Sequence, residues 1–123
     1  MLIQKVLKNH IKFLNDLNEN LDNIQLTIQR NTEVSQLMST GFHRLKEKDR
    51  KTVSKVLLSD LSTVLDYKEA DIVDLVAQLH YTSAIGIVST TESDVYDIVY
   101  CIDIPVMIGR LKQRYTEIET MML

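Results

Sequence analysis

Hydrophobic residues recur along the first third of the chain at alternating spacings of four and three. That spacing places them on one stripe of a slightly underwound α-helix, which is the pattern of a coiled coil or a helical bundle. One histidine interrupts the aliphatic stripe. We call this set the N-terminal seam, and its members are Ile3, Leu7, His10, Leu14, Leu17, Leu21, Ile24 and Ile28. Because such a stripe must be buried, the sequence predicts a helix–helix interface along it, with another helix of this chain or with a second copy.

The first helix should cover at least Leu2–Gln29. Counted on in heptads, the stripe is polar for two positions and then resumes in phase; these positions are Asn31, Ser35, Met38, Phe42 and Leu45. In one interpretation a single helix about 70 Å long reaches Lys48, at about 1.5 Å per residue. In the other, the helix ends near Asn31 and a second begins near Thr32, which Gly41 also favours. We favour the first, a long helix with room for an interruption, because the apolar positions return in phase.

Three further helices are predicted downstream. The first covers Asp49–Asp66 with its first residue as the N-cap, and the second covers Lys68–His80. The last covers Ile104–Met122, with Asp103 as its cap, because Pro105 suits only the first turn of a helix. Their inward-facing positions should be Val53, Val56, Leu57, Leu61, Val64 and Leu65 in the first helix, Ile72, Val73, Leu75, Val76 and Leu79 in the second, and Ile108, Leu111, Tyr115 and Ile118 in the last.

The stretch from residue 84 to residue 104 is ambiguous. Ala84–Val88 is short and apolar, and Val95–Ile104 is rich in β-branched and aromatic residues. If the second segment is a helix, the chain is all-α. If both segments are strands, they form a hairpin near residues 84–104 and the fold is α+β. We favour the helix. Three glycines and one proline are few for 123 residues, and this scarcity also favours helices joined by short connections.

The sequence therefore predicts an all-α fold in one domain. A long amphipathic, coiled-coil-like helix or helical hairpin should occupy residues 1–48, and a compact helical bundle over residues 49–123 should pack on it. Hydrophobic residues make up 45% of the chain and charged residues 25%, which are ordinary values for a globular protein. A single cysteine, Cys101, fits a reducing cytoplasm. The N-terminus lacks the apolar core of a signal peptide, and no run reaches about 18 apolar residues, so we expect a soluble cytoplasmic protein without a membrane partner.

The formal net charge of −3 hides an asymmetry. Acidic residues prevail between residues 60 and 103, where only Lys68 opposes them. A short stretch before them, which we call the basic segment, contains Arg44, Lys46, Lys48, Arg50, Lys51 and Lys55. Attraction between the two regions, within or between subunits, is the first interpretation. The charge of a partner is the second. Contact of the basic segment with nucleic-acid phosphates competes with a solvated helix face, which Glu47, Asp49 and the lack of interleaved aromatic residues favour.

The chain carries no motif for catalysis, metal binding or a nucleotide, so the sequence predicts no cofactor and no enzyme activity. Cys101 lies in an apolar run, where a thiol is usually an inert core residue, and only tertiary structure could bring His43 or His80 to it. His10 is either a pH-sensitive polar contact or a partly solvated position near a helix end, which we favour. One acidic cluster lacks calcium-loop spacing and is expected on exposed helix surface; it comprises Asp66, Glu69, Asp71 and Asp74.

These features together favour a small helical protein–protein interaction module that binds through helical faces. It would be an adaptor, an assembly factor or an inhibitor, including one encoded by a virus or a mobile element. Its partners would be a second copy of itself, another protein, or both, with the basic and acidic regions steering partner choice. The alternative is a nucleic-acid-binding transcriptional regulator that uses residues 44–55.

Overall fold

Six α-helices and one short 3-10 turn make up the part of the chain that the computed structural model describes, residues 2–82 and 94–122. No strand occurs within these ranges, and the all-α prediction is confirmed. The long N-terminal helix followed by a helical bundle is confirmed as well. The elements are α1 (Leu2–Gln29), α2 (Thr32–Met38), η1 (Phe42–Arg44), α3 (Glu47–Leu65), α4 (Glu69–Thr82), α5 (Asp94–Tyr100) and α6 (Ile104–Met121).

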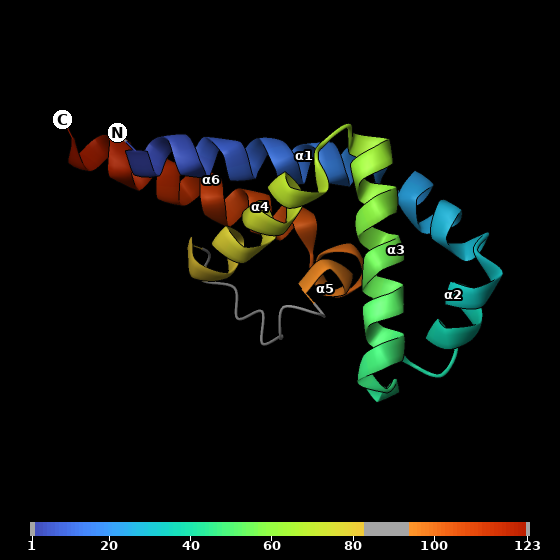
Figure 1. The fold of residues 1–123 in the computed structure, drawn as a ribbon. Helices are drawn as coiled ribbons and strands as arrows, with labels where there is room; N and C mark the ends of the chain where they lie inside the picture. Colours follow the sequence, from blue (N-terminus) through green and yellow to red (C-terminus); the bar gives the residue numbers. More distant parts are fainter. Residues whose placement is uncertain (1, 83–93, 123) are drawn as a thin grey trace.

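Helices α1 and α6 lie side by side and run in opposite directions, so that the two ends of the chain lie together (Figure 1). The contact between these two helices is the most extensive in the fold, and the contact between α1 and α3 is next. Helix α3 crosses the far end of α1, and α2 folds back beside α3 (Figure 1). Helices α4 and α5 pack on each other and on α3. The 28 residues of α1 extend about 42 Å, at about 1.5 Å per residue, and α2, α3, α4 and α6 all contact this helix.

The first helix ends at Gln29, so the favoured single helix to Lys48 is wrong. Asn31 caps α2, because its side-chain Oδ1 accepts a hydrogen bond of 3.1 Å from the backbone N–H of Val34. Gly41 then takes a φ of 96°, in the left-handed region that favours glycine, and ends any helical path toward η1. The second interpretation, in which a new helix begins at Thr32, is confirmed. An N-cap side chain and a left-handed residue thus outweigh a heptad phase that continues across both.

The downstream boundaries follow the sequence closely, with one exception. The N-cap of α3 is Lys46, so Asp49 is wrong as the cap and lies in the first turn instead, where an acidic residue still suits the helix dipole. Asp103 caps α6 as predicted, because its Oδ1 accepts from the backbone N–H of Val106 at 3.2 Å, and Pro105 lies in the first turn. Residues 94–100 are helical, so the strand interpretation of that segment is wrong. The segment 84–88 lies outside the described residues.

One continuous hydrophobic core joins all six helices and η1. Most of the inward positions predicted for α3, α4 and α6 are buried or partly buried in it, whereas Val73 is 41% exposed. None of the helices within the described ranges combines the length and apolar character needed to cross a membrane. The fully buried members of the core include Phe13, Leu14, Leu17, Ile24, Phe42, Leu57, Leu61, Ile72, Leu79 and Ile98.

Candidate functional site

The N-terminal seam lies against other helices of its own chain. Its buried members are Leu7, His10, Leu14, Leu17, Ile24 and Ile28, while Leu21 is partly buried and Ile3 is 38% exposed. Helices α6, α3 and α4 all pack on α1, and the aliphatic members of this face belong to the common core or pack against it, apart from Ile3 at its start. A second copy therefore finds little of the seam exposed, and any association between copies that leaves this fold intact must use a different surface.

The one polar member of the seam, His10, is buried, so the expectation of a partly solvated position is wrong. Its Nε2 lies 3.2 Å from the side-chain Oε1 of Gln78 on α4, which gives the imidazole a partner across the helix interface. Burial lowers the pKa of His10, and this effect exceeds the opposing effect of the hydrogen bond to Gln78, which raises it. The folded protein therefore holds His10 neutral more firmly than the unfolded chain does.

We expect this burial to make the protein less stable in mild acid. As the pH falls below the ordinary histidine pKa of about 6.5, the unfolded chain takes up a proton that folded His10 resists, so the free energy of unfolding declines until the lowered folded pKa is passed. Above the ordinary pKa the residue contributes no pH dependence. Urea unfolding of the parent and of His10→Gln at about pH 7.5 and about pH 5.5 measures how much of the fall in the free energy of unfolding is due to His10. An equal fall in both proteins would show that His10 is not the cause.

The basic segment extends from η1 through the N-cap of α3 into the first turns of that helix. Arg50 is partly buried and donates a hydrogen bond from Nη1 to the backbone carbonyl of Leu45, and Lys51 lies 3.3 Å from the carboxylate of Glu47. Two of its six basic side chains therefore already serve local contacts. The other four, which are exposed, are Arg44, Lys46, Lys48 and Lys55.

A second seam, which was not predicted from the sequence, follows the outer face of α6. The inner face of this helix is buried against α1 through residues such as Met107 and Leu111. On the opposite side, exposed residues follow one another at spacings of three, four, three and four. We call this set the outer seam, and its members are Val106, Gly109, Gln113, Thr116 and Thr120. That spacing is the same heptad pattern that α1 displays, here on a surface that the chain itself leaves uncovered.

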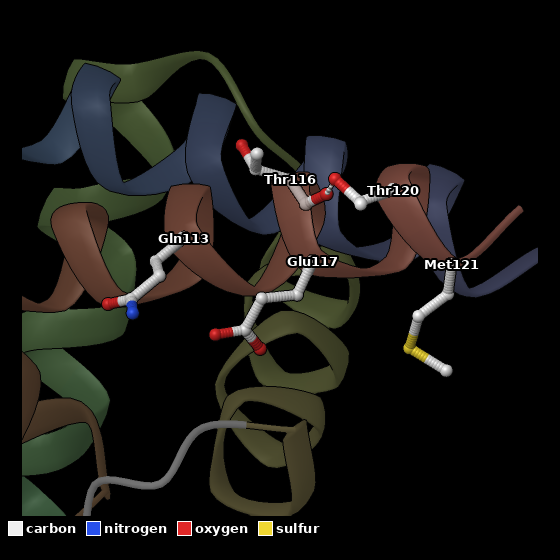
Figure 2. Close-up of a pocket in the computed structure, with 5 residues that line it drawn as sticks. All are labelled: Gln113, Thr116, Glu117, Thr120 and Met121. Atoms are coloured by element: carbon white, nitrogen blue, oxygen red, sulfur yellow. Dashed lines mark hydrogen bonds between the residues drawn. The ribbon is translucent and has the colours of Figure 1, made fainter. Parts of the chain in front are cut away.

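Open space surrounds the outer seam. A methyl group built on Gly109 would meet no atom within 4 Å, and Val106 is 48% exposed. Further along, a shallow pocket is lined by five residues of α6, of which Gln113, Glu117 and Met121 extend to the same side of the helix (Figure 2). The Thr120 hydroxyl donates to the carbonyl of Thr116 at 2.9 Å, which satisfies that side chain locally (Figure 2). The outer seam is therefore accessible and only weakly polar.

Charged residues border the outer seam on both sides, in the positions that flank a coiled-coil stripe. One border carries Arg110 and Glu117, and the other carries Lys112 and Glu119. All four are exposed, and none of them takes part in an ion pair within the described part of the chain. Each border is thus basic toward the start of α6 and acidic toward its end.

A cluster of a different kind joins η1 to α5. The Nε2 of His43 lies 3.5 Å from the Oδ1 of Asp97, and Cys101 lies one helical turn beyond Asp97, with its sulfur within 4.8 Å of a ligand atom of each. Asp97 is 7% exposed, whereas His43 and Cys101 reach solvent. Cys101 is therefore not the inert core residue that its apolar neighbours predicted, and the fold brings His43 to it.

Aromatic rings fix this cluster in place. Phe42 stacks on Tyr96 with ring centroids 4.1 Å apart and an interplanar angle of 9°, and Tyr96 stacks in turn on Tyr100 at 5.1 Å. The imidazole of His43 meets Phe42 and Tyr96 edge to face, at 5.3 Å and 5.7 Å. These contacts hold the histidine ring over α5, so its position depends on buried packing although the side chain is exposed.

The cluster is not arranged for nucleophilic catalysis. Burial, together with the hydrogen bond to Asp97 and its negative charge, raises the pKa of the Cys101 thiol. An activated cysteine needs the opposite, a lowered pKa beside a cationic or basic group. Here the imidazole of His43 lies 3.5 Å from the carboxylate of Asp97, and the negative charge of that carboxylate favours the protonated thiol.

The acidic cluster in α4 and the residues before it is exposed, as predicted. Its four members are Asp66, Glu69, Asp71 and Asp74.

Comparison of this chain with family models, with curated proteins and with solved structures finds no match in any of the three.

Proposed function

We propose that this protein is a helical protein–protein interaction module, that it acts by binding and not by catalysis, and that a second copy is its first partner. The observation that carries the proposal is the outer seam of α6, an exposed heptad stripe whose two borders each change from basic to acidic along the helix. This moves the predicted self-association from the N-terminal seam, which the chain covers itself, to a face that remains accessible.

An antiparallel pair of α6 helices fits this pattern. Heptad packing in that arrangement places Gln113 of one copy opposite Thr116 of the other, and Gly109 opposite Thr120. In the same register, Arg110 lies opposite Glu117 of the second copy. By two-fold symmetry each of these contacts occurs twice.

The other border gives the same result. Its two residues, Lys112 and Glu119, oppose one another across the pair in the register that the seam residues define. All four cross-pairs then join opposite charges, whereas a parallel pair would bring together only Lys112 and Glu117. The charge pattern therefore favours an antiparallel, two-fold symmetric dimer.

The packing of α6 on α1 supports this assembly. Helices α1 and α6 form an antiparallel pair along one side of the molecule (Figure 1), and two such pairs make the four-helix arrangement in which helices of this length commonly associate. The seam itself supplies small and polar contacts with little apolar area to bury. We expect a reversible dimer that depends on charge and is weakened by salt.

The same face suits a helix from another protein with a similar stripe, which is how an adaptor or inhibitor of this size would act. The cytoplasmic setting expected from the single cysteine agrees with this role. Nucleic-acid binding through the basic segment stays a prediction. A salt-sensitive electrophoretic shift would support it, and the partial local use of Arg50 and Lys51 weighs against it.

Charge reversal on the two halves of α6 tests the dimer. We expect Arg110→Glu with Lys112→Glu, and separately Glu117→Lys with Glu119→Lys, each to raise the dimer dissociation constant about tenfold or more. The reason is that four exposed pairs of about 0.2–1 kcal/mol each become repulsive. An equimolar mixture of the two variants should dimerise again, since all four cross-pairs are attractive in the mixed dimer. Light scattering over a concentration series measures the dissociation constant of each double variant and of their equimolar mixture.

A matched control carries the same change of charge elsewhere. Lys48→Glu with Lys55→Glu alters two exposed lysines of α3, away from the outer seam, and should leave the dissociation constant unchanged. Circular dichroism verifies that every variant keeps its helical content. A parent that is monomeric throughout the series, or a mixture that does not re-form dimers, would overturn the proposal.

A further inference from the structure

Three side chains of the kinds that bind transition metals converge between η1 and α5. One ligand atom of His43, one of Asp97 and one of Cys101 all lie within 4.8 Å of one another. From this geometry we propose that His43, Asp97 and Cys101 form a binding site for Zn²⁺, with one nitrogen, one oxygen and one sulfur ligand.

The separations match tetrahedral coordination. With Zn–N and Zn–O bonds of about 2.1 Å and an angle near 109°, two such ligands lie about 3.4 Å apart. The Nε2 of His43 and the Oδ1 of Asp97 are 3.5 Å apart. A thiolate at about 2.3 Å from the metal would lie about 3.6 Å from either atom, a separation that fits inside the 4.8 Å limit within which all three ligand atoms fall.

The local structure supports the same assignment. Asp97 lies on α5 and Cys101 directly follows the last residue of that helix, four positions on, so one further helical turn brings both side chains to the same side. The backbone N–H of Cys101 donates to the carbonyl of Asp97 at 2.8 Å, which keeps this turn closed up to the last ligand. The rings of Phe42 and Tyr96 hold the imidazole of His43 in position. Binding would therefore require little reorganisation of the protein.

The ligand set also determines the cation. A site with nitrogen and sulfur ligands excludes Mg²⁺ and Ca²⁺, which prefer oxygen, and a histidine–cysteine–carboxylate set suits Zn²⁺. The chain supplies three ligands, so the fourth position would hold water or a group from a partner. The ion would link residue 43 to residue 97, and it would thereby fix η1, with the chain that leads into α3, onto α5.

Calorimetric titration of the tag-free, reduced protein with Zn²⁺ tests the site. We expect one ion per chain and a thermal midpoint that rises with Zn²⁺ concentration. His43→Ala and Cys101→Ser should each weaken binding by roughly tenfold to a hundredfold or more, since even loss of a supporting group costs that much. Asp97→Asn should weaken it too while keeping the shape of the side chain. Co²⁺ in place of Zn²⁺ should produce a thiolate-to-metal absorption band that disappears in Cys101→Ser.

Asp60→Asn is the matched control, because Asp60 on α3 acts electrostatically on Tyr100, the last residue of α5, but is not a ligand. It should bind Zn²⁺ like the parent. Equal Zn²⁺ affinity in the parent, His43→Ala and Cys101→Ser would overturn the proposal, as would a Co²⁺ complex without the thiolate band. The test does not depend on the α6 dimer, since both the binding and the absorption band are properties of one chain.

Discussion

Leu14→Ala is expected to lower the free energy of unfolding by about 2–5 kcal/mol, the range for deletion of a fully buried leucine side chain. Leu14 is 0% exposed and lies in the middle of the N-terminal seam, where α1 contacts the rest of the molecule. The substitution removes apolar contact and leaves a cavity that the surrounding helices fill only in part. Urea unfolding monitored by circular dichroism measures the loss.

Leu26→Ala on the same helix is the matched control. Leu26 is 45% exposed, so the same substitution removes far less buried area and should cost well under half as much. Both changes keep a good helix former in α1, so any difference reflects burial and not helix propensity. Equal losses for the two variants would mean that α1 does not present its N-terminal seam to the core.

Phe42→Ala should be similarly severe, at about 3–5 kcal/mol. Phe42 is 1% exposed and stacks on Tyr96, so η1 is attached to α5 chiefly through this ring. The same substitution removes a contact that positions His43, and we therefore expect it to weaken Zn²⁺ binding as well. Unfolding without metal, followed by a Zn²⁺ titration, separates the two effects.

His43→Ala provides the comparison for Phe42→Ala. The side chain of His43 is 61% exposed but is a partner of the buried Asp97, so its removal should lower metal-free stability by about 1 kcal/mol, less than Phe42→Ala, while it eliminates a metal ligand. If His43→Ala destabilised the metal-free protein as much as Phe42→Ala, the aromatic stack could not be the main attachment of η1.

Periodicity was sufficient to predict α1, α3, α4 and α6, because each buries a face whose repeat is visible in the sequence, whereas the separate α2 was not the favoured interpretation and α5 was left open between helix and strand. The N-terminal seam predicted α1 from Leu2 as far as Gln29, although its continued phase wrongly favoured a helix to Lys48. Asp103 with Pro105 predicted the start of α6, since an N-cap and a first-turn proline are local signals. Local signals also account for the main error. Phe42 continues the heptad phase of α1 and is buried as that phase implies, but it reaches the core from η1 after the chain has turned at Gly41.

The functional surfaces were harder to predict, for two different reasons. The outer seam is visible in the sequence as Val106, Gly109, Gln113, Thr116 and Thr120, but its residues are small or polar, so a search for apolar stripes passes over it. The cluster of His43, Asp97 and Cys101 depends on the packing of η1 against α5. No sequence spacing relates residue 43 to residue 97, and only the i, i+4 spacing of Asp97 and Cys101 could have been noticed.

Cysteine cross-linking between the α6 helices of two copies tests whether the outer seam pairs them in antiparallel register. In a Cys101→Ser background, Gln113→Cys and Thr116→Cys place one thiol each on the seam, and a third variant, Lys48→Cys, serves as the reference. A disulfide requires Cα atoms within about 4.4–6.8 Å. We expect the mixture of Gln113→Cys and Thr116→Cys to form a mixed dimer faster than either variant cross-links with itself. Self-linking that is faster than mixed linking, or rates no higher than for Lys48→Cys, would contradict it.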